Sequence, residues 1–459
     1  MITNQLEFKE LLKKSSCRGF GLQIALLTLM TFVFYIPLTW ARIYIDINAP
    51  AINKLKVAVA DFHNLGGSNE HPELSRKIAN IINHDLDLSG YFSPIDRQAF
   101  LENKDEGITQ ETISFKNWSV IGAELLVKGD YTIIGNKIEL VARLFDTYRG
   151  KQILGRRLLG SIKDYRWVVH RFSNEIIRRL TGRDSMFLTQ LAYVDSSTGN
   201  KEIWLSDYDG YNSRLITSGS YIALSPRISP DGCHIIYTSY KDGRPKLYLK
   251  DLRSGYTKVL SQRKGLNIGA AWTPDGTRVA LTLSVNGNPD IYLIDLNGKI
   301  LKRLTSSWGI DVSPCFSPDG KMMAFVSNRS GSPQIYIKDL TTGNCRRLTF
   351  EGRYNTSPCW SRLNRIVYTS MNQGSFDIFT MDPNGGEPKQ LTEGPGNDED
   401  PCWSPCGRYI VFSSNRLGRY HLYIMSANGQ NQRRITGGEG EQTSPSWGVL
   451  GNRCIRWRW

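Results

Sequence analysis

Short apolar runs alternate with polar turns through about the last three fifths of the chain, and the pattern repeats. One unit, read from Ser313, holds four strand-length runs rich in β-branched and aromatic residues, bounded by Gly, Pro, Asn and Asp. Its first turn is Pro318-Asp319-Gly320, whose residue types favour turn dihedral angles. The turn position recurs at intervals of about 44 residues, a spacing typical of a propeller blade. It is occupied by Pro230, Pro274, Pro318, Arg362, Pro405 and Val449.

The order of these strands predicts how the repeat closes. Each strand type occurs six times, but the series starts with a second-type strand near Tyr193 and ends with the first-type strand Ser444–Trp447. The last strand gains partners only by joining the first strands in one shared blade, which also removes two free sheet edges. We therefore predict an all-β six-bladed β-propeller over residues 187–448, followed by a C-terminal tail over residues 449–459.

Residues 42–183 follow a different pattern. The apolar strand Val57–Phe62 is followed by apolar residues at helical spacing, and a second helical pattern ends the region. Between them, Leu125–Asp146 is typical of a hairpin that turns at Gly135-Asn136. Strand, helix, hairpin and helix predict an α/β N-terminal domain of ordinary size, with its boundary at Thr181–Met186.

Residues 1–41 have the layout of a secretory signal peptide. Basic residues precede an apolar run from Phe20 to Trp40, which ends in Thr39-Trp40-Ala41. The run is also long enough to span a bilayer, so an uncleaved anchor is the alternative interpretation. Both interpretations predict that the rest of the chain is exported.

The formal net charge of +14 is compatible with an acidic partner. Lys and Arg are spread through every repeat, and export argues against a nucleic-acid role. We expect peripheral association with an anionic envelope surface. The basic-aromatic end Arg456-Trp457-Arg458-Trp459 is either an interfacial anchor or a terminus without a role.

Eight cysteines in an exported chain suggest disulfides. However, Cys315, Cys359 and Cys402 occupy one equivalent position in three inner strands, where a residue near the axis must be small. We interpret these three as packing residues. The short spacing between Cys402 and Cys406 leaves one bridge open.

No motif for catalysis or cofactor binding occurs in the sequence. It contains no nucleophile elbow, Walker loop, dinucleotide fingerprint or zinc-protease motif, and its six His lack ligand spacing. Of these, His84 and His170 fall on predicted helices and are interpreted as surface or hydrogen-bonded residues. Asp207–Gly210 resembles half a calcium loop but lies where other blades turn, and Asp398–Asp400 is interpreted as a solvated rim. We predict no metal, no cofactor and no enzymatic activity.

Several motifs together resemble the TolB family, the periplasmic β-propellers of the Tol–Pal system in Gram-negative bacteria. The blade repeat alone is shared with peptidases and other proteins. The resemblance becomes specific because the repeat follows an exported α/β domain that begins Arg42-Ile43-Tyr44-Ile45-Asp46. Supporting motifs are Val57–Phe62, Leu88-Ser89-Gly90-Tyr91-Phe92, Leu126-Val127-Lys128-Gly129 and Leu191-Ala192-Tyr193-Val194.

The resemblance implies a monomeric, periplasmic protein-interaction hub that supports outer-membrane integrity and envelope constriction at cell division. It implies binding of a TolA-type inner-membrane protein through the segment Arg42, Ile43, Tyr44, Ile45, Asp46 and Ile47. It also implies binding of a Pal-type peptidoglycan-associated lipoprotein at one mouth of the propeller channel. By position, the mouth residues are Asn267, Ile268, Gly269, Asp311, Val312, Asn355, Thr356, Asp398, Glu399, Gln442 and Thr443.

Two departures and two alternatives stay open. Arg362-Leu363-Asn364 replaces the Pro-Asp-Gly turn in one blade, and the tail extends beyond the usual end of the family. A carbohydrate-binding propeller is the first alternative, suggested by the many Trp and Tyr. A hydrolytic envelope propeller is the second.

Overall fold

The computed structural model describes residues 53–66, 71–102, 106–219, 221–372 and 374–451. The predicted signal, the segment Arg42–Ile47 and tail residues 452–459 lie outside these ranges. Within them, no helix is both long and apolar enough to cross a membrane.

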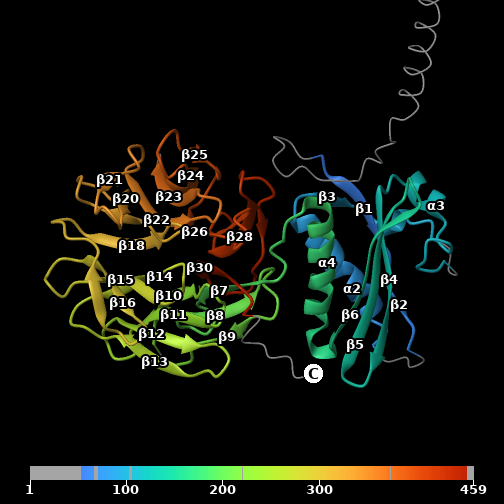
Figure 1. Ribbon diagram of the computed structural model, residues 1–459, viewed down its shortest axis with the longest axis horizontal. Coiled ribbons are helices and arrows are strands. Elements are labelled where there is room, and N and C mark those ends of the chain that lie inside the picture. The colour runs from blue at the N-terminus through green and yellow to red at the C-terminus, as the bar shows by residue number, and fades with distance from the viewer. Residues whose placement is uncertain (1–52, 67–70, 103–105, 220, 373, 452–459) are drawn as a thin grey trace, which may run out of the picture. The chain divides into compact units, whose positions relative to one another are not determined.

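The N-terminal domain is a mixed β-sheet with helices packed on it (Figure 1). The strand order is β3-β1-β4-β5-β6, with β2 beside β4; β1 is parallel to its two neighbours and the other strands of this order are antiparallel. The elements are β1 (Leu55–Val59), β2 (His63–Asn64), α2 (Leu74–Leu88), β3 (Phe92–Pro94), η1 (Arg97–Ala99), α3 (Phe115–Val120), β4 (Leu125–Ile134), β5 (Lys137–Asp146), β6 (Lys151–Ser161), η2 (Ile162–Asp164) and α4 (Tyr165–Thr181).

Helices α2 and α4 lie side by side on this sheet, α2 against β1 and β3 and α4 against β5 and β6. Helix α2 buries Leu74, Ile78, Ile82 and Leu86, one apolar stripe at helical spacing. The hairpin β4–β5 turns at Gly135, which has a positive φ, as predicted. The sequence pattern did not predict strands β3 and β6 or helix α3. Strand β6 was missed because it is an edge strand with many exposed polar residues and two glycines.

The second domain is a six-bladed β-propeller, which confirms the predicted fold class. Each blade is a four-stranded antiparallel sheet. The inner strands are β10 (Ala223–Ile228), β14 (Asn267–Trp272), β18 (Asp311–Phe316), β22 (Tyr354–Trp360), β26 (Asp398–Trp403) and β30 (Gln442–Val449). The second strands are β7 (Thr189–Asp195), β11 (His234–Ser239), β15 (Arg278–Leu283), β19 (Met322–Ser327), β23 (Ile366–Asn372) and β27 (Tyr409–Ser414). The third strands are β8 (Glu202–Asp207), β12 (Lys246–Asp251), β16 (Asp290–Asp295), β20 (Gln334–Asp339), β24 (Ser375–Met381) and β28 (His421–Ser426). The outer strands are β9 (Arg214–Leu215), β13 (Thr257–Ser261), β17 (Ile300–Arg303), β21 (Cys345–Arg347), β25 (Lys389–Gln390) and β29 (Arg433–Arg434).

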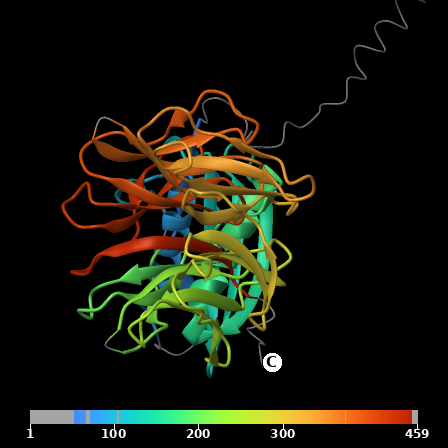
Figure 2. The same cartoon turned by 90° about the vertical axis from the view of Figure 1, so that its left-hand side faces the viewer.

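The last strand closes the propeller on the first. Strand β30 pairs with β7 in the sheet β30-β7-β8-β9, and Figure 2 shows the red β30 beside the green start of the propeller. Trp447 Nε1–H donates to Thr189 Oγ1 at 2.7 Å, and Ser446 Oγ accepts from Ile228 N of the next blade at 3.0 Å. The closing blade is thus bonded to the start of the propeller and to the next blade.

Aromatic pairs repeat inside the blades. They join a second strand to a third strand, with ring centroids 5.6 to 5.9 Å apart. The pairs are Tyr237–Tyr248, Phe325–Tyr336, Tyr368–Phe379 and Phe412–Tyr423. Such pairs contribute about 0.5 to 1.5 kcal/mol beyond their buried area. These aromatics therefore belong to blade packing, so they do not favour the carbohydrate-binding alternative.

The Pro-Asp-Gly turn is held by the aspartate and the hydroxyl before it. Ser317 Oγ donates to Asp319 Oδ1 at 2.6 Å and accepts from Met322 N at 2.9 Å. Hydrogen bonds from Ser317 and the backbone lower the pKa of Asp319. In the blade where Arg362-Leu363-Asn364 forms this turn, Asn364 takes the left-handed position with φ +58 and accepts from Trp360 Nε1 at 3.0 Å. Asn tolerates that conformation, so the turn is preserved.

Glycine at one of these turns also makes room for the end of strand β30. Gly232 and Gly276 have nearly the same φ, +74 and +69. A Cβ on Gly232 would lie 2.2 Å from Val449 O, whereas a Cβ on Gly276 would meet nothing closer than 3.6 Å. Gly276→Ala is expected to cost about 1 to 2 kcal/mol from left-handed strain alone. Gly232→Ala is expected to cost more, because backbone near β30 must move. Urea unfolding of both variants measures the loss in the free energy of unfolding. Equal losses would contradict the expected difference between the two glycines.

Candidate binding surfaces at the channel and the interdomain joint

Every inner strand contains a bulge near its start. The pairing with the second strand shifts register after the second or third residue of each inner strand, and one residue at the shift has a left-handed φ. These six residues, the channel ring, are Ser225, Gly269, Ser313, Ser357, Asp400 and Ser444. Asp400 joins three neighbouring strands, because Ser357 Oγ and Ser444 Oγ donate to its two carboxylate oxygens at 2.7 and 2.9 Å. The ring therefore surrounds the propeller axis.

Some predicted mouth residues have buried side chains. They stand two positions before the ring residues, are at most 5% exposed, and bond within the protein. Asp311 accepts from Arg329 at 2.9 Å, and Asp398 accepts from Arg416 at 2.7 Å. The other three bond to Ser261, Gln334 and His421 respectively; they are Asn267, Asn355 and Gln442. These five side chains anchor the loops that lead into the inner strands and are not at the surface.

The other predicted mouth residues are half-buried. They lie at or directly before the ring positions and are Ile268, Gly269, Val312, Thr356, Glu399 and Thr443. Together with Leu224 they make the mouth apolar over three blades and polar over the other three. Tyr420 OH donates to Glu399 at 3.1 Å, and burial, followed by the charge of Asp400, raises the pKa of Glu399.

Sequence reasoning missed Leu224 and most of the channel ring. The missed ring members are Ser225, Ser313, Ser357, Asp400 and Ser444. A signal was present, since each of these residues directly precedes a proline. Their left-handed conformation could not be read from it, because Ser rarely adopts positive φ outside such a bulge.

A second cluster of polar groups joins the two domains. His170 on α4 contacts Asp85 on α2 through Nδ1 at 2.9 Å, and Tyr208 in the turn after β8 donates its hydroxyl proton to the same carboxylate. Arg166, also on α4, donates to Asp209 at 2.5 Å. We call Asp85, Arg166, His170, Tyr208 and Asp209 the interdomain joint. All but Arg166 are buried.

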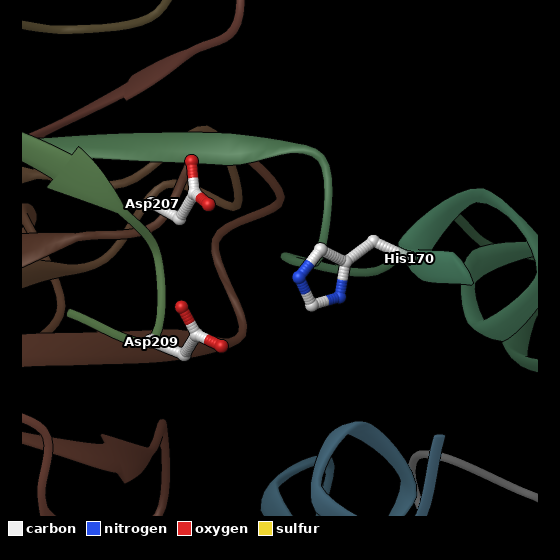
Figure 3. Close-up of side chains that lie close together, drawn as sticks. All are labelled: His170, Asp207 and Asp209. Carbon is white, nitrogen blue, oxygen red and sulfur yellow. The ribbon is translucent and has the colours of Figure 1, made fainter. Parts of the chain in front are cut away.

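Figure 3 shows His170 facing Asp207 and Asp209, and one ligand atom from each lies within 4.8 Å of the others. This donor set is not suited to a metal ion, because Arg166 already neutralises Asp209 and lies 3.5 Å from His170 Nε2. Burial, then the charge of Asp209, raises the pKa of Asp207. Gly210 N–H donates to Asp207 O in a tight turn, which agrees with the turn predicted there.

Further contacts lie around the joint. Arg433 pairs with Asp87 at 2.6 Å, and Tyr409 OH donates to Ser89 O at 2.9 Å. Tyr409 follows the turn that ends an inner strand, whereas the channel mouth lies where inner strands begin. The N-terminal domain therefore contacts the propeller at the end opposite to the mouth.

Raising the pH is expected to weaken the joint. Burial by itself lowers the pKa of His170, but Asp85 outweighs burial, and the net pKa is raised. Asp209 also raises it, and Arg166 opposes it. A histidine with a raised folded-state pKa stabilises the fold fully below its unfolded pKa of about 6.5, and the contribution is lost as pH rises through the folded value. We expect Tm to fall over this range in the native protein and less steeply in His170→Gln. His84→Gln, at an exposed position of α2, is the control and should keep the native slope.

Family profiles and known proteins that match this chain point to one family. A family profile described as the TolB beta propeller domain matches residues 177–451, and one described as the TolB amino-terminal domain matches residues 43–153. The Tol-Pal system proteins TolB of Desulfosudis oleivorans and Syntrophotalea carbinolica are 42% and 40% identical over 199 and 210 residues. These alignments cover 43% and 46% of this chain and 45% and 49% of the relatives, so the chain spans about half the length of the curated relatives it matches.

A solved structure extends the comparison to both domains. TolB from Acinetobacter baumannii is similar over 88% of this chain and 99% of that chain, with 29% identity and a TM-score of 0.76. Fold and surfaces together define a two-domain propeller protein with an α/β domain at one end of the blades and a lined channel mouth at the other. The propeller profile alone matches more than half of the sequence. The chain belongs to the TolB family of Tol-Pal system proteins.

Proposed function

We propose that this protein is a periplasmic interaction hub of the Tol–Pal envelope system. In this role it binds a Pal-type lipoprotein at the channel mouth and a TolA-type inner-membrane protein through Arg42–Ile47. It thereby supports outer-membrane integrity and envelope constriction at cell division. The observation that carries the proposal is the mouth itself, where half-buried side chains converge on one rigid surface in a TolB-family chain. The buried polar residues of the site serve a structural role, because Asp311, Asn355 and Asp398 each bond to another side chain of the protein.

The mouth supports protein binding through its mixed surface. Leu224, Ile268 and Val312 offer apolar area over three neighbouring blades, and Glu399 offers a carboxylate on the other side. Interface cores that bind tightly combine an apolar centre with a few oriented polar groups. The channel ring and the buried anchor side chains fix the backbone that carries these residues. Binding a partner therefore costs little conformational entropy.

Val312→Lys is expected to weaken binding of a purified Pal-type periplasmic domain by about 30-fold or more, as for a substituted hot spot. The matched control is Leu301→Lys, an exposed apolar residue on outer strand β17. Calorimetry on both variants separates an effect at the channel mouth from a general effect of adding a lysine to the propeller. Equal affinity for native protein and Val312→Lys would overturn the assignment of the mouth, and recovery of a glycan instead of a lipoprotein from envelope extract would overturn the function.

The two binding regions are also proposed to be coupled. If a Pal-type partner favours a state in which Arg42–Ile47 is docked on its own protein, it lowers binding of a TolA-type partner, and linkage requires the reverse effect. Deleting Arg42–Ile47 should then abolish TolA-type binding and change Pal-type affinity. Unchanged Pal-type affinity in that deletion would exclude the coupling and leave the hub intact.

A further inference from the structure

Two cysteine side chains meet across neighbouring blades at the channel. Cys359 lies on inner strand β22 and Cys402 on inner strand β26, and their Sγ atoms are 4.0 Å apart. Both residues are partly exposed and neither is in a disulfide. The same two strands are also joined two residues earlier by the hydrogen bond from Ser357 to Asp400. The sulfurs are therefore held side by side rather than meeting by chance.

The prediction that these cysteines only fill space was incomplete. Trp447 N–H donates to Cys402 Sγ at 3.3 Å, and Trp403 N–H donates to Cys359 Sγ at 3.5 Å. Each cysteine sulfur thus accepts a hydrogen bond from a backbone N–H of the next inner strand. Backbone donors and nearby cations stabilise a thiolate, which is the reactive form of cysteine.

The pair is electrostatically asymmetric. The hydrogen bond from Cys359 lowers the pKa of Cys402 to about 7; the charge of Arg227 and the Trp447 N–H act in the same direction, whereas burial opposes them. The same hydrogen bond, together with burial, raises the pKa of Cys359. Cys402 is therefore suited to nucleophilic attack as a thiolate, whereas Cys359 stays a protonated thiol until the mixed disulfide has formed.

We propose that Cys359 and Cys402 form a redox-active dithiol that reacts with an organic disulfide and closes to an inter-blade disulfide. The Cys402 thiolate attacks one sulfur of the disulfide R–S–S–R, the S–S bond breaks, and one thiolate RS⁻ leaves. Cys359 then gives its proton to the released RS⁻, and its thiolate attacks the Cys402 sulfur of the mixed disulfide. A second RS⁻ leaves. Two electrons pass from the protein to R–S–S–R, which is reduced to one thiol and one thiolate.

The required movement is small. A disulfide bond is about 2.05 Å long, so the sulfurs must approach by about 2 Å. Rotation of the cysteine side chains supplies part of this distance, and strands β22 and β26 are in contact. Cys315, in the equivalent position of the preceding inner strand, likewise accepts the Trp360 N–H, but burial raises its pKa to about 12. It is the matched control.

The test titrates the purified full chain with oxidised glutathione, blocks the remaining thiols by alkylation, and maps the peptides by mass spectrometry. A linked Cys359–Cys402 peptide is expected in the native protein and in Cys315→Ser. Cys359→Ser is expected to stop at a mixed disulfide between Cys402 and glutathione. Cys402→Ser is expected to form neither product. Circular dichroism checks that each variant is folded. If a variant does not fold, the native chain by itself still tests whether Cys359 and Cys402 become linked.

A second measurement uses the rate of alkylation. The rate at Cys402 should rise through about pH 7, as its pKa requires, while Cys315 stays slow. Cys359 and Cys402 remaining separate thiols at excess oxidised glutathione would overturn the proposal. Linkage of Cys402 to Cys406 or to the exposed Cys345 instead would also overturn it.

Discussion

Asp85→Ala is expected to lower the free energy of unfolding by about 3 to 5 kcal/mol, as when one partner is removed from a buried ion pair. Asp85 is fully buried and accepts from both His170 and Tyr208, each of which is also buried. Without the carboxylate, the histidine loses the main group that raises its pKa, and the tyrosine hydroxyl is left without its acceptor. Urea unfolding followed by tryptophan fluorescence measures the loss.

A matched control lies two residues away on the same helix. Asp87 pairs with Arg433 across the same two domains, but the two side chains are 32% and 42% exposed. An exposed ion pair contributes at most about 1 kcal/mol. Asp87→Ala should therefore be nearly neutral. Similar losses for both variants would show that the joint does not depend on its buried charges.

Trp447→Ala is expected to cost about 3 to 5 kcal/mol, as for other buried Trp removals. Trp447 is 7% exposed on β30, the strand that closes the propeller, and it bonds to Thr189 at the start of β7. The substitution removes a contact between the last propeller strand, β30, and the first, β7. It should therefore weaken the closure of the propeller as well as leave a cavity.

The equivalent residue of the neighbouring blade separates the two effects. Trp403 is similarly buried, but its Nε1–H has no partner among the described residues. Trp447→Phe should lose about 1 kcal/mol with its hydrogen bond, whereas Trp403→Phe should be nearly neutral. Thermal unfolding of the two Phe variants measures the difference. Equal values would contradict a role for this hydrogen bond in closure.

Binding residues were harder to predict than elements. The repeat places Asn267, Asp311 and Asn355 at the channel mouth, but position alone cannot show whether a polar side chain faces solvent. The structure turns them inward, where Asp311 bonds within its own blade, whereas Asn267 and Asn355 bond to the preceding blade and to the loop that follows it. A buried polar group must be paired, so these residues act as anchors. The bulge beside these anchors instead presents the next residue of each inner strand at the channel mouth.

The cysteines show the same limit. Equivalent spacing led us to interpret Cys315, Cys359 and Cys402 as packing residues, and all three are free thiols in the structure. The Cys402–Cys406 bridge left open by spacing is wrong, because both of these residues are also free. Only the meeting of two blades brings Cys359 and Cys402 together, since they are one whole repeat apart along the chain.

The sequence by itself determined the repeat, the six blades, the shared closing blade and the α/β domain before them. Local turn chemistry and strand periodicity specify these features, and both are written in neighbouring residues. Tertiary structure alone decided which mouth side chains are accessible, and it alone paired Asp85 with His170 and Tyr208. Those contacts join residues far apart in the chain, and burial and pairing depend on what packs around a residue rather than on its neighbours in sequence.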